Sequence, residues 1–114
     1  MAKVEFKIPC KGKRGAIEYK TKSGNVAFFD VAGEKIKFVL QADSEGEATE
    51  LTHYASGFVF GRLNPVKVQH VVSRGSYCQL SDRSAAEILI ARAIDRNGAD
   101  KVLATLKAAP VINA

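Results

Sequence analysis

The chain has 114 residues, of which 46% are hydrophobic and 25% are charged, and its formal net charge is +5. These proportions are typical of a globular protein and exclude a chain that is disordered over long stretches. A chain of this length buries enough apolar surface to fold without a metal or a disulfide. We therefore expect one domain over residues 1–114, strand-rich over 1–80 and helical over 83–109.

The N-terminal residues 1–7 alternate charged and apolar side chains, so they lack the continuous apolar core of a signal peptide. The apolar runs elsewhere are far shorter than the roughly 18 residues that a membrane span needs. These observations predict a cytoplasmic protein with no membrane association. In that compartment we expect the two cysteines, Cys10 and Cys78, to be reduced and buried like small apolar side chains.

Apolar and polar side chains alternate through the first forty residues, which is the two-residue period of half-buried strands. Pro9 ends the first run because it cannot donate to a sheet ladder. Gly and Asn tolerate positive φ, so we expect a turn at 23–25 and another at Gly33-Glu34. The strands predicted here are 3–8, 17–20, 26–31 and 35–40.

A polar, acidic loop over 41–49 separates these strands from a second strand-rich set. The expected members of that set are 51–54, 58–63 and 66–72, with Gly57 and Asn64-Pro65 between them. Val66, Val68, His70 and Val72 would share one face of the last strand.

The period then changes to that of a helix. Ser84 followed by Glu87 has the spacing of a capping box, and apolar residues recur on one helical face as far as Ile94. Asn97-Gly98 predicts the end of this helix, and a second helix is expected over 100–108, ended by Pro110. The whole pattern predicts an α+β fold: a curved antiparallel sheet of about six or seven strands, followed by two C-terminal helices packed on one face. A half-open barrel crossed by the first helix is a close variant.

Candidate metal ligands and nucleophiles are scattered through the sequence. Cys10, Cys78, His53 and His70 show none of the paired spacings of zinc sites, so we expect no metal and no cofactor. The densest polar cluster is the segment 53–57, His-Tyr-Ala-Ser-Gly. It fits a His–Tyr–Ser constellation, but it also fits an ordinary strand end, which Ser and Gly commonly mark. We therefore expect no catalytic residues and no enzyme activity.

Positive charge is the remaining signal. Residues 1–40 carry nine Lys or Arg and four Asp or Glu, whereas 41–50 carry four acids and no base. The segment 11–15, Lys-Gly-Lys-Arg-Gly, lacks the spacing of a nucleotide-binding phosphate loop. It would serve either as a contact for backbone phosphates or as a charged turn that keeps an exposed hairpin soluble.

The charge pattern predicts a small, non-enzymatic binding module that binds nucleic acid weakly and without sequence preference, through a basic strand face. Aromatic strand residues could stack on bases if they face outward, although they alternate with core positions; these are Tyr19, Phe28, Phe29, Phe58 and Phe60. The alternative is an adaptor or stoichiometric inhibitor that acts through a protein interface, and a homodimer is possible. The predicted nucleic-acid contacts are Lys11, Lys13, Arg14, Lys20, Lys22, Lys35 and Lys37.

Overall fold

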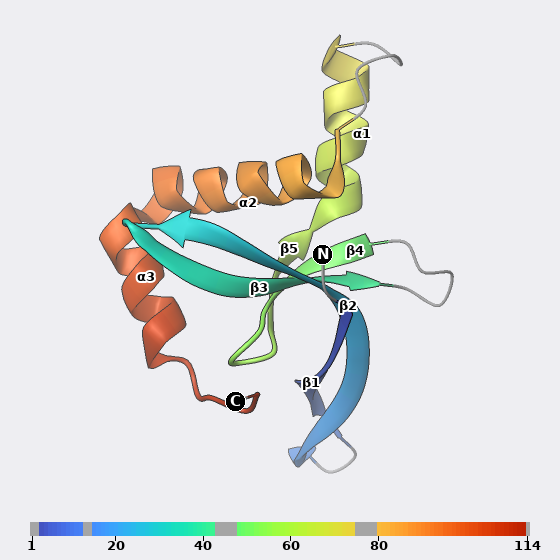
Figure 1. Cartoon of the computed structure of the whole chain (residues 1–114), viewed down its shortest axis with the longest axis vertical. Coiled ribbons are helices and arrows are strands. Elements are labelled where there is room, and N and C mark those ends of the chain that lie inside the picture. Colours follow the sequence, from blue (N-terminus) through green and yellow to red (C-terminus); the bar gives the residue numbers. More distant parts are fainter. Residues whose placement is uncertain (1–2, 13–14, 43–47, 75–79, 114) are drawn as a thin grey trace.

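The computed structural model describes residues 3–12, 15–42, 48–74 and 80–113. Within these ranges the chain forms an α+β fold in which one antiparallel sheet precedes three helices (Figure 1). The strands are β1 (Lys3–Lys11), β2 (Ile17–Val31), β3 (Glu34–Ala42), β4 (Ala48–His53) and β5 (Phe58–Arg62). The helices are α1 (Leu63–Arg74), α2 (Asp82–Asn97) and α3 (Ala99–Ala108). None of the described helices is both long and apolar enough to cross a membrane.

The sheet is a meander in which each strand pairs with its neighbour in the sequence, in the order β1-β2-β3-β4-β5. Register shifts occur between Gln41 and Ala42 and between Leu51 and Thr52. Such irregularities increase the local twist of a sheet, and Figure 1 shows that the sheet curls into a half-barrel. The predicted curved antiparallel sheet is therefore confirmed, with five strands in the described ranges instead of six or seven.

Two predicted strands are in fact one, because the expected turn at 23–25 lies inside β2. Gly24 pairs with Val4 on one side and with Gln41 on the other, so the ladder passes through it without a break. A Cβ at this position would lie 2.3 Å from the backbone oxygen of Leu40. Glycine is required at position 24 because β3 approaches too closely for a side chain. Close backbone approach is a common reason for glycine inside a strand.

The predicted strand at 66–72 is wrong, since this segment belongs to α1. Pro65 lies in the first turn of the helix, where its missing N–H removes no intrahelical hydrogen bond. Leu63 and Val66 are the buried side chains, and their spacing of three is helical. Val68 and Val72 are exposed, so the two-residue alternation of valines does not mark a buried face.

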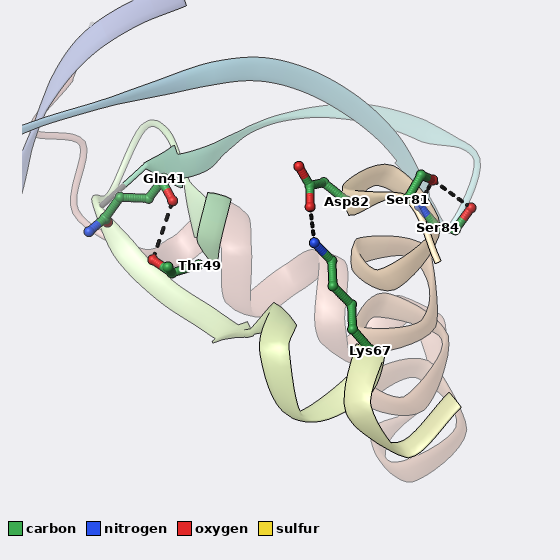
Figure 2. A network of polar contacts seen from close by, with 6 residues as sticks. All are labelled: Gln41, Thr49, Lys67, Ser81, Asp82 and Ser84. Carbon is green, nitrogen blue, oxygen red and sulfur yellow. Dashed lines mark hydrogen bonds and ion pairs between the residues drawn. The ribbon is translucent and has the colours of Figure 1, made fainter. Parts of the chain in front are cut away.

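The start of α2 also differs from the prediction. The N-cap is Ser81, whose Oγ accepts a hydrogen bond from the backbone N–H of Ser84 at 3.1 Å. Figure 2 shows Lys67 of α1 reaching Asp82 in the first turn of α2, close to this cap. The predicted end at Asn97-Gly98 is confirmed: Gly98 has φ of 88° and its N–H donates to the Ile94 carbonyl at 2.7 Å.

The main core lies between the helices and one face of the sheet. By register, Phe38 shares this face with Ala27 on β2 and with His53 on β4. Phe38 is fully buried and makes edge-to-face contacts with Phe29 and Phe60, at centroid distances of 5.8 and 5.7 Å. The side chains that cover this face come from all three helices: Leu63, Val66, Ala85, Ala86, Ile90, Val102 and Leu106.

Part of the opposite face of the sheet is buried without a covering helix. Phe6 and Val39 lie on this face and are almost fully buried, yet neither belongs to the cluster that the helices cover. The ring of Phe6 lies 6.5 Å from that of Tyr54, at the end of β4. The half-barrel therefore has a small interior of its own.

The C-terminal segment bridges β1 and the turn that joins β4 to β5. The Asn113 side chain accepts a hydrogen bond from the Lys7 N–H at 2.7 Å and donates to the Lys7 and Tyr54 carbonyls, both at 2.8 Å. The backbone N–H groups of Ile112 and Asn113 both donate to the carbonyl of Ala55. We call this arrangement the Asn113 clasp.

Loss of the cap should weaken α2. We expect Ser81→Ala to lower the free energy of unfolding by about 1 kcal/mol, because a donor in the first turn loses its acceptor. Ser84→Ala is the matched control, since Ser84 contributes its backbone N–H to the cap and should change stability less. Thermal denaturation followed by circular dichroism measures both variants, and a larger effect of Ser84→Ala would place the cap at Ser84 instead.

Loss of the clasp should destabilise the half-barrel. Asn113→Ala removes three hydrogen bonds, for which we expect a loss of roughly 1–3 kcal/mol in urea denaturation. Asn113→Asp should be at least as damaging, because a carboxylate would face two carbonyl oxygens. Asn97→Ala removes one exposed amide contact, to the Ala93 carbonyl, and serves as the control. A midpoint for Asn113→Ala equal to that of the wild type would contradict the clasp.

Candidate nucleic-acid interface

A two-stranded ribbon extends from the sheet where β1 and the first half of β2 pair. Its ladder runs from the pair Lys7–Thr21 to the pair Lys11–Ile17, and Figure 1 shows it pointing away from α1 and α2. The β2 residues 17–21 are all exposed. We call residues 7–22 the β1–β2 arm.

The arm carries the excess charge of the whole protein. Residues 7–22 contain six Lys or Arg and one Glu, a net charge of +5. The chain has 17 Lys or Arg and 12 Asp or Glu, so the remainder holds eleven of each and is neutral. Over that remainder, the four acids of 41–50 offset an excess of four bases in 51–114. Residues 7–22 are therefore a local concentration of positive charge, and such a concentration attracts polyanions.

Cations project from both faces of the arm. Residues directly opposite each other in an antiparallel ladder share a face, and successive residues alternate. Lys20 and Lys22 consequently lie on the face of Ile8 and Phe6, whereas Lys7 and Lys11 lie on the other. Tyr19 is on the second face, directly opposite Pro9, with 55% of its surface exposed. An exposed ring thus lies between two lysines.

The structure places five of the seven predicted contact residues, some on the arm and others on β3. Lys11, Lys20 and Lys22 lie together on the arm, and Lys13 and Arg14 lie outside the described residues. Lys35 and Lys37 are on β3, on the same nominal face as Lys20 and Lys22.

The two β3 lysines are nevertheless not part of the arm. Lys37 pairs with Phe28, which is six residues, or about 20 Å of strand, beyond Lys22. The Lys37 ammonium lies 3.8 Å from the ring centroid of Tyr54, and Lys35 is opposite Asp30. The structure therefore does not unite all the predicted lysines in one stripe.

The aromatic residues also divide. Tyr19, Phe28 and Phe58 are exposed, whereas Phe29 is buried and Phe60 packs against the core. Lys7, which was not among the predicted contacts, belongs to the arm through its pairing with Thr21. The hairpin register shows that Lys7 belongs to the arm, whereas the alternation of residues within a single strand does not show this.

The candidate metal ligands lie on different elements. Cys10 is on β1, His53 on β4 and His70 on α1, while Cys78 lies outside the described residues. Among the described side chains, no group of three or more His, Cys, Asp or Glu could hold a metal ion.

The His53–Ser56 pair fastens the β4–β5 turn. The Ser56 Oγ accepts a hydrogen bond from the Phe58 N–H at 3.2 Å and lies 2.8 Å from His53 Nδ1. Burial lowers the pKa of His53, so its ring is neutral near pH 7 and Nδ1 can accept a hydrogen bond from the hydroxyl. Gly57 follows with φ of 68°, and its N–H donates to the His53 carbonyl. These bonds fit the interpretation of 53–57 as a strand end.

Comparisons of the chain with models of protein families, with curated proteins and with solved structures find no match. The chemistry of the exposed surface is therefore the basis for a functional proposal. Among the described residues, the arm carries four lysines and one acid: Lys7, Lys11, Lys20, Lys22 and Glu18.

His53 should make folding stability depend on pH. Its pKa in the folded protein lies below the ordinary value of about 6.5, so between these two values the unfolded chain binds more protons. The contribution of His53 to the free energy of unfolding should be constant above about pH 6.5 and fall as the pH decreases toward the lower folded pKa, by at most about 1.4 kcal/mol per pH unit.

The variant His53→Asn isolates this contribution. The asparagine oxygen can take the place of Nδ1 as acceptor for Ser56, but it does not titrate in this range. Urea denaturation from pH 5 to pH 8 should show a shallower slope for the variant below pH 6.5. Parallel profiles for the two proteins would exclude His53 as the source of the slope.

Proposed function

We propose that this protein binds nucleic acid weakly and without sequence preference through the β1–β2 arm. The observation that carries the proposal is the confinement of the whole net charge of +5 to residues 7–22 on one projecting hairpin. Lys7, Lys11 and Lys20 are exposed there, and Lys22 is half-exposed. The rest of the chain has no net charge, so the arm supplies the attraction for a polyanion that we propose.

The shape of the arm suits this ligand. Lysines that neutralise backbone phosphates release condensed counterions, which provides affinity without base recognition. A two-stranded ribbon is narrow enough to enter the major groove of a duplex, and an exposed ring such as Tyr19 can stack on the base of a single strand. The charge of the arm is compatible with both duplex and single-stranded nucleic acid. Stacking on Tyr19 would contribute only to the binding of single strands.

A protein-binding role is the second candidate. It is favoured by Val68 and Val72, which lie one turn apart on α1 and are exposed over 62% and 80% of their surface. Two neighbouring apolar side chains on a helix can dock on a partner, although isolated exposed valines are common on soluble proteins. An adaptor or inhibitor would bind its partner through α1 and would tolerate charge changes in the arm.

Reversal of charge in the arm should weaken binding. We expect Lys11→Glu/Lys20→Glu to weaken binding of a labelled oligonucleotide at least about tenfold at low salt, measured by fluorescence anisotropy. For duplex DNA the salt slope should also fall by about 0.9 for each phosphate that the variant no longer neutralises. The matched control is Arg96→Glu/Lys101→Glu, which changes the net charge equally but on exposed helical positions, and its affinity should stay within about twofold.

Two further measurements complete this test. Lys13→Glu/Arg14→Glu probes the two basic residues between β1 and β2 in the sequence in the same way. Tyr19→Leu should weaken binding of single strands by roughly 5- to 150-fold, which corresponds to about 1–3 kcal/mol for one stacked base, and leave duplex binding nearly unchanged. Wild-type protein that shows no binding at tens of micromolar would contradict the proposal, since non-specific binders typically reach about 10⁻⁴ to 10⁻⁶ M.

A further inference from the structure

A second surface feature is a groove between α3 and the β4–β5 hairpin. Its volume is about 630 Å³, within the range of roughly 300–1,000 Å³ that small-molecule sites occupy. Val102 and Leu106 of α3 and Phe60 of β5 form its apolar lining together with Phe58. Phe58 remains 62% exposed, so one aromatic wall of the groove is uncovered.

The groove exists because of how the surrounding elements are held. Among the described strands, β5 pairs with β4 alone, and its aromatic residues therefore lie at the edge of the sheet. After α3 the chain turns away to reach Ala55, to which Ile112 and Asn113 donate hydrogen bonds. The lining positions on the helical side include small residues that leave the space open, namely Ala93, Ala108 and Ala109.

Among the described residues, the groove has a positive charge and no negative one. Of the described residues that line it, Lys101 alone is charged, and none is acidic. The other polar groups already have partners: Asn97 donates to the Ala93 carbonyl, Thr105 to the Lys101 carbonyl, and Ser56 is bonded within the β4–β5 turn. In the described part of the chain, no carboxylate pairs with the Lys101 ammonium. The groove therefore offers one cation beside an apolar lining.

We propose that this groove binds a small amphipathic carboxylate. The apolar body would lie along Phe58, Phe60 and Leu106, where its burial provides most of the affinity. The carboxylate would pair with Lys101, which fixes the orientation of the ligand. From Lys101 to Ala108 the helix rises about 10 Å, since each residue adds about 1.5 Å, so the body is of medium length.

Decanoate is a suitable probe, and decanol is its uncharged counterpart. Titration of the full chain with decanoate should shift the amide resonances of residues around the groove, such as Phe58 and Thr105, in ¹H–¹⁵N correlation spectra. Thr105→Tyr places a ring in the groove from an exposed position of α3, and it should weaken decanoate binding at least about tenfold by calorimetry.

Lys101→Gln tests the head group. We expect decanoate to bind about two- to fivefold more weakly, the range of an exposed ion pair, whereas decanol should bind both proteins equally. Lys107→Gln is the matched control, since it removes the same charge from the same helix but lies outside the groove and pairs with Glu34. Equal melting midpoints of all variants would establish that each of them is folded.

Several results would overturn the proposal. Absence of resonance shifts at the groove with decanoate would exclude the site, and equal decanoate affinity of Lys101→Gln and wild type would exclude the carboxylate pairing. Binding to vesicles that contain an anionic lipid, without binding of monomeric decanoate, would assign the apolar surface to a membrane. Nucleic-acid binding has no part in these measurements, so their outcome is independent of the arm.

Discussion

The close approach of β1 to the β4–β5 turn is the constraint on which the rest of the fold depends. A Cβ at Gly57 would lie 2.4 Å from the Lys7 carbonyl, so only glycine allows this contact, and the positive φ of Gly57 favours glycine as well. The Asn113 clasp fixes the same contact, because the Asn113 side chain forms hydrogen bonds with both backbone groups of Lys7. Together they keep the five-stranded meander curled, which encloses Phe6 and Val39 without a covering helix. The other face remains free for the three helices.

The same closure separates the charged part of the molecule from its neutral part. β1 is held at Lys7, and beyond that point, among the described strands, the ribbon has no neighbour other than its own partner strand. A pair of strands alone is only marginally stable in water, so the arm derives its order from the half-barrel at its base. Lysine-rich sequence suits such a ribbon, because charge also prevents its edges from pairing with other chains. Solubility and the proposed polyanion binding would therefore use the same residues, and charge alone does not distinguish these two roles.

Much of the fold was predictable because local chemistry and tertiary structure agree. The strands 35–40 and 58–63 and the stop at Gly98 follow from alternation and from glycine conformation, and the structure confirms them within a few residues. α1 was not predictable from its valines, since their two-residue spacing is compatible with a strand and only the burial of Leu63 and Val66 reveals the helix. The continuity of β2 through Gly24 depends on contact with β3, which no local pattern records. For the candidate interface, the sequence offered the lysines but not their arrangement, because the hairpin register decides which of them share the arm.

The arm and the groove meet at one structural element. Gly57 packs against β1 at the base of the arm, while Ser56, its neighbour, lines the groove. The two surfaces nevertheless rely on different forces. Contacts between lysines and phosphates weaken steeply as salt rises, because binding releases counterions. Burial of an apolar body is not screened in this way, and salts such as sulfate strengthen it. The response to salt would therefore separate the two proposed kinds of binding in the intact protein, even though a single turn supports both surfaces.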